Sequence, residues 1–279
     1  MDFRIKLAKA VQQHNSILCV GLDPNLDLLP DIIKNNRSAN PKKVGQFLKT
    51  VIDVTKDHCT AYKPNLGFFE ALGPDGWDLF AEILHYLPSD KIVIADAKRG
   101  DISSTAEHYA KAFFNKFAID AITINPLMGF ETLDPFLSNP EKAVYTLTLT
   151  SNPGASDILL QRLADGRTVA SYIAQKLAQK QEESQSAIGM VVGATKATKL
   201  HSVIDHFPNA PLLIPGIGTQ GGSTKALADA LKNHKGIPLV NSSRSIIYAG
   251  SGNKNWEKDV AESAKKLNSQ LASITEQYV

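Results

Sequence analysis

Short apolar runs recur along the chain, and stretches with the helical spacing of apolar residues separate them. Most runs are apolar throughout rather than alternating, which is typical of parallel strands that are covered on both faces. The strand-like runs are 17–21, 60–63, 92–96, 121–125, 143–149, 188–192, 212–215 and 238–241. The helical patterns include 44–56, 78–87, 105–117, 158–181, 224–233 and 256–271.

Eight strand-like runs that alternate with helices predict an α/β fold, a closed (β/α)8 TIM barrel in a single domain over residues 1–279. The length of 279 residues is near the typical size of that fold. An open doubly wound sheet is the alternative, because strand order cannot be read directly from sequence. Residues 152–186 exceed what one crossover needs, and Asp165-Gly166 predicts a turn between two helices there. We interpret this segment as a helical insertion within the barrel.

Composition narrows the class of protein. Apolar residues make up 43% and charged residues 21%, which is enough apolar surface for a full core. The net charge is only +2, and Lys and Arg are spread along the chain, so we expect no nucleic-acid interface. Residues 1–15 form an amphipathic pattern rather than a signal peptide, and no apolar run is long enough to span a membrane. Cys19 and Cys59 lie in or beside apolar runs, which predicts buried free thiols in a cytoplasmic protein.

Polar residues close or follow most of the apolar runs. In a barrel, the chemistry lies at the carboxyl ends of the strands, so these positions are the candidates for an active site. They are Asp23, Lys63, Asp96, Lys98, Asn125, 148–151, Gln220 and Arg244.

The most charged of these positions follow the third run. By the period of two in a strand, Asp96 and Lys98 share one face, and Asp101 comes just before a helix. Ser104 with Glu107 fits a capping box for that helix. An ion-pair network with Asp101 as a helix cap is the structural alternative. The strand-end position favours a functional site, because three charged groups are costly to hold together there.

The pattern Asp96-x-Lys98-x-x-Asp101-Ile102-x-x-Thr105 resembles the signature of the orotidine 5′-phosphate decarboxylases. The residues at positions 96–102 resemble those of the bacterial second type of that family. Other motifs of that family match in the same order from Leu18 to Ala249. The resemblance implies that Lys98, held charged by Asp96 and Asp101, stabilises a carbanion at C6 of the pyrimidine and then donates the proton.

Other roles follow from the same resemblance. It implies that Lys63 completes the charged network, that Asp23 binds the ribose and that Ser151 hydrogen-bonds the pyrimidine. Each residue also has a simpler interpretation. Lys63 would be a strand-end lysine that reaches solvent, Asp23 would form a turn before Pro24, and Ser151 would belong to an ordinary turn. The family's active form is a homodimer, in which Asp101 and Thr105 reach into the partner subunit's site.

A glycine-rich segment follows the seventh run. Residues 216–221 match the pattern G-x-G-x-x-G of dinucleotide-binding folds. That fingerprint normally lies in a first βαβ unit, and an acidic residue ends the next strand. Here the motif comes late in the chain, and the next strand-like run ends in Asn241. We favour a barrel phosphate site, which uses the seventh and eighth loops. The family's phosphate contacts correspond to Gln220 and Arg244, although Ser243 stands where the family often has Gly. The loop 215–222 is the expected lid.

The resemblance implies an enzyme that uses no metal and no cofactor on a small nucleotide, orotidine 5′-monophosphate, and yields uridine 5′-monophosphate. The seven His are scattered and suggest no metal-ligand set. The nearest rivals are Mg²⁺-dependent sugar-phosphate decarboxylases and aldolases of the same barrel superfamily, which share D-x-K-x-x-D. A non-catalytic sensor of phosphorylated ligands is a rival from another class, although a sensor would not need a proton donor.

Overall fold

Eight parallel strands close into a barrel in the order of the sequence. The computed structural model describes residues 1–193, 197–216 and 224–279. The pairing of β1 with β8, for example Leu18 with Val240, closes the ring, which confirms the predicted barrel and excludes the open sheet. The strands are β1 (Leu18–Leu22), β2 (Ala61–Pro64), β3 (Ile92–Arg99), β4 (Ala121–Ile124), β5 (Ala143–Leu149), β6 (Ala187–Val192), β7 (Leu212–Pro215) and β8 (Pro238–Ser242).

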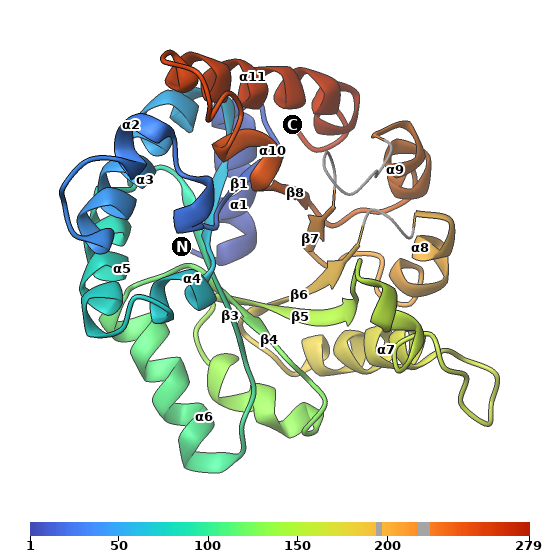
Figure 1. Ribbon diagram of the computed structural model, residues 1–279. Helices are drawn as coiled ribbons and strands as arrows, with labels where there is room; N and C mark the ends of the chain where they lie inside the picture. Colours follow the sequence, from blue (N-terminus) through green and yellow to red (C-terminus); the bar gives the residue numbers. More distant parts are fainter. Residues whose placement is uncertain (194–196, 217–223) are drawn as a thin grey trace.

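Helices surround this ring of strands (Figure 1). The longer ones bury one apolar stripe each against the barrel, as the helical spacing predicts. The α-helices are α1 (Phe3–His14), α2 (Asp31–Lys34), α3 (Asn40–Thr55), α4 (Leu66–Glu70), α5 (Pro74–Tyr86), α6 (Ser103–Ala110), α7 (Val169–Glu182), α8 (Ala197–Ile204), α9 (Thr224–Leu231), α10 (Arg244–Ile247) and α11 (Trp256–Thr275). The short helical segments are η1 (Leu26–Leu28), η2 (Lys56–His58), η3 (Lys111–Lys116), η4 (Phe130–Phe136) and η5 (Pro153–Ser156).

Helix α1 packs across the amino-terminal end of the barrel. Its buried face includes Phe3 and Leu7, which confirms the amphipathic pattern. Lys6 Nζ lies 2.5 Å from the carboxylate of Asp120, which comes just before β4. This end of the barrel is therefore closed, and the opposite end is left for binding.

The segment between β5 and α7 differs from the sequence-based expectation. Gly166 has φ +85°, so the predicted turn is confirmed, but an antiparallel bridge between Arg162 and Thr168 flanks it instead of two helices. The Thr168 hydroxyl accepts from Ser171 N at 3.1 Å and caps α7, so the helix begins only after it. The helix expected from residue 158 is wrong, and the segment projects from the rim of the barrel (Figure 1).

Two local expectations have different outcomes. The capping box is wrong, because α6 begins at Ser103 with φ +48°, Ile102 occupies the cap position, and no side chain caps the helix. Cys19 and Cys59 are both buried and unpaired, as predicted. Within the described part of the chain, no helix combines the length and apolar character that a membrane crossing requires.

Candidate active site

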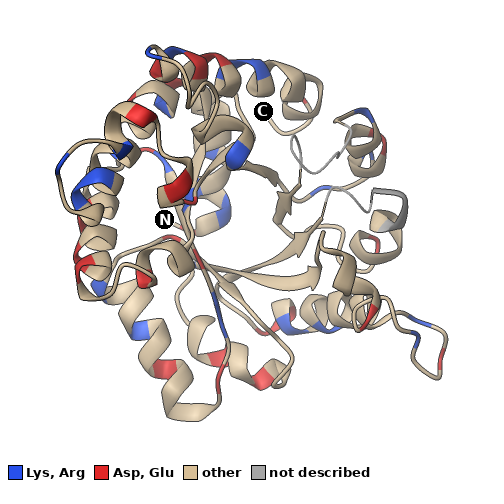
Figure 2. Cartoon of the chain, viewed as in Figure 1, with Lys and Arg blue, Asp and Glu red and all other residues tan. Residues whose placement is uncertain are grey.

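A cavity of about 340 Å³ opens at the carboxyl end of the barrel. The described strands carry charged residues only in β2 and β3, whereas charge elsewhere lies largely on the surrounding helices and loops (Figure 2). Every strand or the loop after it contributes to the wall. The lining residues are Asp23, Lys63, Asn65, Asp96, Lys98, Thr123, Leu147, Thr150, Ser151, Asn152, Val191, Leu213, Pro215, Gly216, Asn241, Ser242, Ser243 and Arg244.

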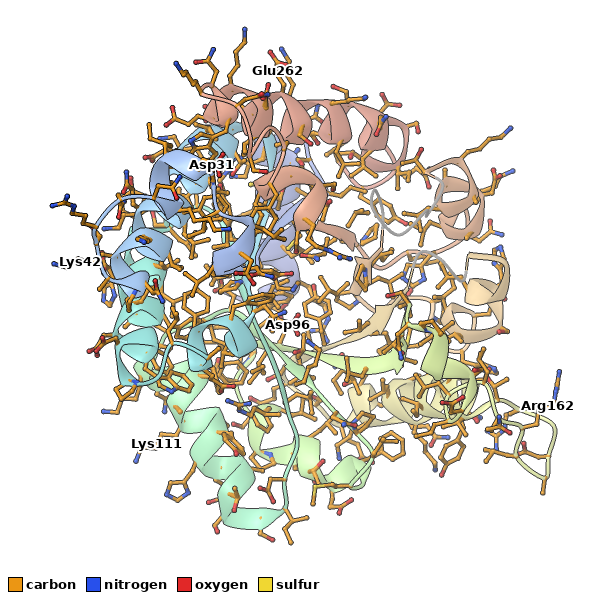
Figure 3. The ribbon with its side chains drawn as sticks, viewed as in Figure 1. Asp31, Lys42, Asp96, Lys111, Arg162 and Glu262 are labelled. Atoms are coloured by element: carbon orange, nitrogen blue, oxygen red, sulfur yellow. The ribbon has the colours of Figure 1, made fainter. Side chains whose placement is uncertain are left out.

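Asp96 is the centre of a charged network in this cavity. Its two carboxylate oxygens contact different lysines: Lys63 Nζ lies 2.7 Å from Oδ2, and Lys98 Nζ lies 2.6 Å from Oδ1. The side chains of Lys63 and Asp96 are 5% and 11% exposed, whereas that of Lys98 is 50% exposed. Asp96 lies toward the middle of the ring, in contrast to Lys111 and Arg162 at its periphery (Figure 3). Lys98 is therefore the ammonium that a bound molecule can reach.

Opposite charges keep the buried part of this network ionised. Burial opposes the charge on Lys63, but the carboxylates of Asp96 and Asp23 outweigh it and raise the pKa of the lysine. Burial likewise opposes the charge on Asp96, but Lys63 and Lys98 outweigh it and hold the pKa of that carboxyl below its ordinary range. Lys63 and Asp96 are therefore both charged at neutral pH.

Asp23 and Ser151 lie on opposite parts of the wall, after β1 and β5. Asp23 Oδ1 is buried without a hydrogen-bond partner among the described atoms, while its backbone carbonyl accepts from the Tyr248 hydroxyl at 2.7 Å. A Cβ on Gly193 would lie 2.7 Å from Ser151 Cα, so the glycine lets β6 approach the Ser151 loop. Both predicted residues are thus brought to the cavity.

Arg244 and Gly216 lie where the sequence predicts a phosphate site. Gly216 directly follows β7 and has φ +100°, a conformation that favours glycine, and Arg244 begins α10 after β8. In the described part of the chain, Arg244 forms no ion pair that would occupy it as a surface salt bridge. Ser243 is the residue that departs from the family pattern. Its side chain has room because Gly21 lies beside it: a Cβ on Gly21 would be only 1.8 Å from Ser243 Oγ. Gln220 and most of the expected lid lie outside the described residues.

Asp101 and Thr105 do not line the cavity of their own chain. The Asp101 carboxylate accepts from Ile102 N at 2.8 Å, and Thr105 is exposed on α6. Asp101 makes no ion pair with Lys98, or with any other described residue. Within one subunit, only Asp96 of the two predicted carboxylates therefore contacts Lys98.

The comparisons with known proteins agree with this geometry. Residues 16–258 match the model of the orotidine 5′-phosphate decarboxylase / HUMPS family. The chain belongs to that family. An orotidine 5′-phosphate decarboxylase from Herpetosiphon aurantiacus is 38% identical over 95% of this chain and 94% of its own. One from Christiangramia forsetii is 38% identical over 97% and 98%.

Solved structures give the same assignment. The Leishmania donovani OMP decarboxylase superposes with a TM-score of 0.84, at 33% identity, covering 99% of both chains. A Toxoplasma gondii structure described as a putative orotidine-monophosphate decarboxylase has a TM-score of 0.88 at 29% identity. These similarities extend over nearly the full chain, so they include every strand of the barrel.

Sequence reasoning missed several polar side chains that line the site of this decarboxylase-family barrel, among them Asn65, Thr123 and Asn241. Asn65 follows Lys63 by two residues, and Thr123 lies within β4. Asn241 lies one residue before the end of β8, and its Oδ1 is buried with no hydrogen-bond partner among the described atoms. The signal for Asn65 and Asn241 was their position at strand ends. Thr123 carried no such signal, because a threonine inside an apolar run is typical of an ordinary strand residue.

In residues 1–193, 197–216 and 224–279, no group of three or more His, Cys, Asp and Glu side chains is placed to hold a metal ion. The site instead presents one exposed ammonium, a buried ion pair and, at a separate part of the wall, the guanidinium of Arg244. This arrangement can bind an anion at one end and stabilise developing negative charge at the other.

Proposed function

We propose that this protein converts orotidine 5′-monophosphate to uridine 5′-monophosphate, the last step of de novo UMP biosynthesis, without metal or cofactor. The observation that carries the proposal is the Lys63–Asp96–Lys98 network at the carboxyl end of a barrel of this family. Curated relatives that are 36–38% identical bear the name of the decarboxylase, among them those from Herpetosiphon aurantiacus and Dehalococcoides mccartyi.

In this reaction the C6–carboxylate bond breaks, CO2 leaves, and the electron pair stays on C6. The Lys98 ammonium stabilises that charge and then gives its proton to C6. Asp96 fixes the ammonium through a 2.6 Å contact. A unit charge at about 4 Å contributes roughly 4 kcal/mol at a surface-like dielectric, so such a contact is large enough to matter. The benefit is greatest in the transition state, where the carbanion develops.

Asp96 also acts on the substrate carboxylate. Lys63 and Lys98 together keep Asp96 ionised, so it repels the carboxylate that is to leave. The repulsion disappears as neutral CO2 forms. Lys63 is too buried to serve as the proton donor, and its role is to hold the charge of Asp96.

The remaining wall residues bind the rest of the nucleotide. Arg244 and Gln220 bind the phosphate, since a guanidinium offers a fork of donors to phosphate oxygens. Asp23 binds the ribose through its buried Oδ1, which has no hydrogen-bond partner among the described atoms, and Ser151 binds the pyrimidine. Closure of loop 215–222 over the phosphate would shield the site from water.

The active form in this proposal is a homodimer with shared sites. Asp101 and Thr105 face away from their own cavity and reach into the site of the partner subunit. Exposed apolar side chains lie beside them in the loops after β3 and β4: Ile102, Leu127 and Met128 are 53–57% exposed. These two loops are adjacent, because Asn125 N donates to Arg99 O at 2.8 Å. Apolar surface beside a carboxylate that forms no ion pair with a described residue is what a subunit interface would cover.

We propose that the protein is cytoplasmic, in keeping with its two buried free thiols. Its proposed partners are the nucleotide and a second copy of the chain, with no nucleic acid and no membrane.

The test is the loss of orotidine 5′-monophosphate absorbance with purified protein in EDTA. We expect full turnover with the chelator present. Activity that vanishes in EDTA and returns with Mg²⁺ would assign the chain to the sugar-phosphate branch. Binding of the nucleotide without turnover would favour the sensor.

A further inference from the structure

Strand β3 is irregular where its charged residues lie. Ala95 pairs with Ile122 of β4, and the next pair is Arg99 with Ile124. Three residues of β3, from Asp96 to Lys98, therefore stand opposite the single residue Thr123. Such bulges re-aim side chains and are common beside active sites.

The backbone of this bulge is held in an unfavourable conformation. Lys98 has φ +47°, in the left-handed region that a lysine rarely adopts. That conformation persists only where surrounding contacts determine it. The two charged side chains at the ends of this bulge, those of Asp96 and Lys98, meet at 2.6 Å.

The contact that fills the bulge is the hydroxyl of Thr123. Lys98 N donates to Thr123 Oγ1 at 2.9 Å, and Thr123 Oγ1 donates to Asp96 Oδ1 at 2.9 Å. The direction of both bonds is fixed, because a peptide N–H can only donate and an ionised carboxylate can only accept. Thr123 is 1% exposed, so water does not compete for either bond.

We infer that Thr123 is a positioning residue for decarboxylation: its hydroxyl fixes the left-handed backbone of Lys98 and the rotation of the Asp96 carboxylate together. The same Oδ1 accepts from Lys98 Nζ, so the hydroxyl aligns the ammonium relative to C6 of the substrate. This inference rests on the proposed function and assigns Thr123 no contact with the reacting atoms.

The test compares Thr123→Val, which keeps the shape and removes the hydroxyl, with Thr123→Ser, which keeps the hydroxyl. Thr146→Val is the matched control, because Thr146 is a fully buried barrel threonine whose hydroxyl has no partner among the described atoms. The measurements are kcat and KM for orotidine 5′-monophosphate and the affinity for uridine 5′-monophosphate by calorimetry.

We expect Thr123→Val to lower kcat about tenfold or more, since a hydrogen bond to a charged group is lost. KM and the affinity for product should stay within about twofold, because phosphate and ribose contacts are untouched. Thr123→Ser should restore most of kcat, and Thr146→Val should match the wild type.

A Thr123→Val enzyme with wild-type kcat would overturn the inference, as would a Thr123→Ser enzyme equally impaired or an equal loss in Thr146→Val. If Thr123→Val does not fold, Thr123→Ala makes the same comparison without the added methyl contact. If the wild type does not turn over the nucleotide, the proposed function fails and a crystal structure of the variant decides the inference. Lys98 should then leave the left-handed region, and an unchanged Lys98–Asp96 geometry would refute the role of Thr123.

Discussion

At the scale of residues, two lysines share one carboxylate and differ in what else they can reach. Lys63 is buried against Asp96 Oδ2, whereas Lys98 contacts Oδ1 and leaves half of its side chain exposed. An unpaired buried lysine would be costly, so Lys63 is tied to the charge of Asp96. In the proposed mechanism, this difference in exposure makes Lys98 the reactive group and leaves Lys63 to hold the charge of Asp96.

Lys98→Ala should remove nearly all turnover while the fold is retained. The change deletes both the charge at C6 and the proton donor, so the loss should be several kcal/mol in the activation free energy. Steady-state kinetics measure the loss, and the melting temperature monitors folding. Lys258→Ala, at a 75% exposed lysine, is the control. A variant that keeps about a tenth of the activity, a loss near 1.4 kcal/mol, is incompatible with this role.

Arg244→Ala should weaken substrate binding more than it slows turnover. Removal of a charge-assisted phosphate contact should cost about 2–4 kcal/mol in kcat/KM, with most of the change in KM. Arg162→Ala is the matched control, because the guanidinium of Arg162 donates to the Gly166 carbonyl within the projecting segment and does not line the cavity. An unchanged KM with a lowered kcat would place Arg244 in the chemical step instead.

At the scale of elements, close contacts between neighbouring strands keep the barrel wall in shape. Tyr145 of β5 pairs in register with Gly189 of β6, and its ring covers the glycine. A Cβ on Gly189 would lie 2.6 Å from Tyr145 Cδ1 and 2.7 Å from the Pro211 carbonyl oxygen. The glycine is therefore required by packing, not by its backbone angles.

Gly189→Ala should lower the free energy of unfolding by about 1–3 kcal/mol, because the ring and the neighbouring backbone must shift to admit the methyl group. Urea denaturation measures this change. Gly252→Ala is the control, since nothing lies within 4 Å of a Cβ there, and it should change stability by less than about 0.5 kcal/mol. Equal stability of the two variants would show that the barrel wall accommodates the methyl group freely.

At the scale of the whole molecule, a single chain leaves its predicted site incomplete. The cavity of one subunit contains Asp96 and Lys98, while Asp101 and Thr105 lie outside it. A two-fold interface that passes these residues across would complete both sites at once.

The shared-site dimer makes a quantitative prediction for mixed subunits. Lys98→Ala and Asp101→Ala subunits should each be nearly inactive alone. Random exchange makes about half the dimers mixed, and each mixed dimer has one native site, so activity should recover to roughly a quarter of the wild type. If Asp101 serves its own chain, every site keeps one lesion, and mixing after confirmed subunit exchange restores nothing.

The sequence by itself determined the barrel and most of its site. Eight apolar runs predicted eight strands, because a strand covered on both faces must be apolar along its length. Charged residues at the end of an apolar run indicate a functional site, and this position predicted four residues that line the cavity: Lys63, Asp96, Lys98 and Arg244. The starts of helices were harder to predict, because they depend on local hydrogen bonds. Helix α7 begins only after the Thr168 cap, and α6 begins at Ser103, so that Ser104 does not cap it.

Only the tertiary structure decided how the charged groups are shared. Asp96 contacts two lysines, whereas Asp101 contacts neither. Asp96 and Lys98 lie in the bulge between β3 and β4, and a bulge arises only from pairing between strands. Thr123 and Gly193 have no charge or motif to mark them, and their importance comes from what lies opposite them in the closed barrel. Apolar patterning is local along the chain, whereas these contacts join residues of neighbouring strands that are far apart in the sequence and meet only when the strands pair.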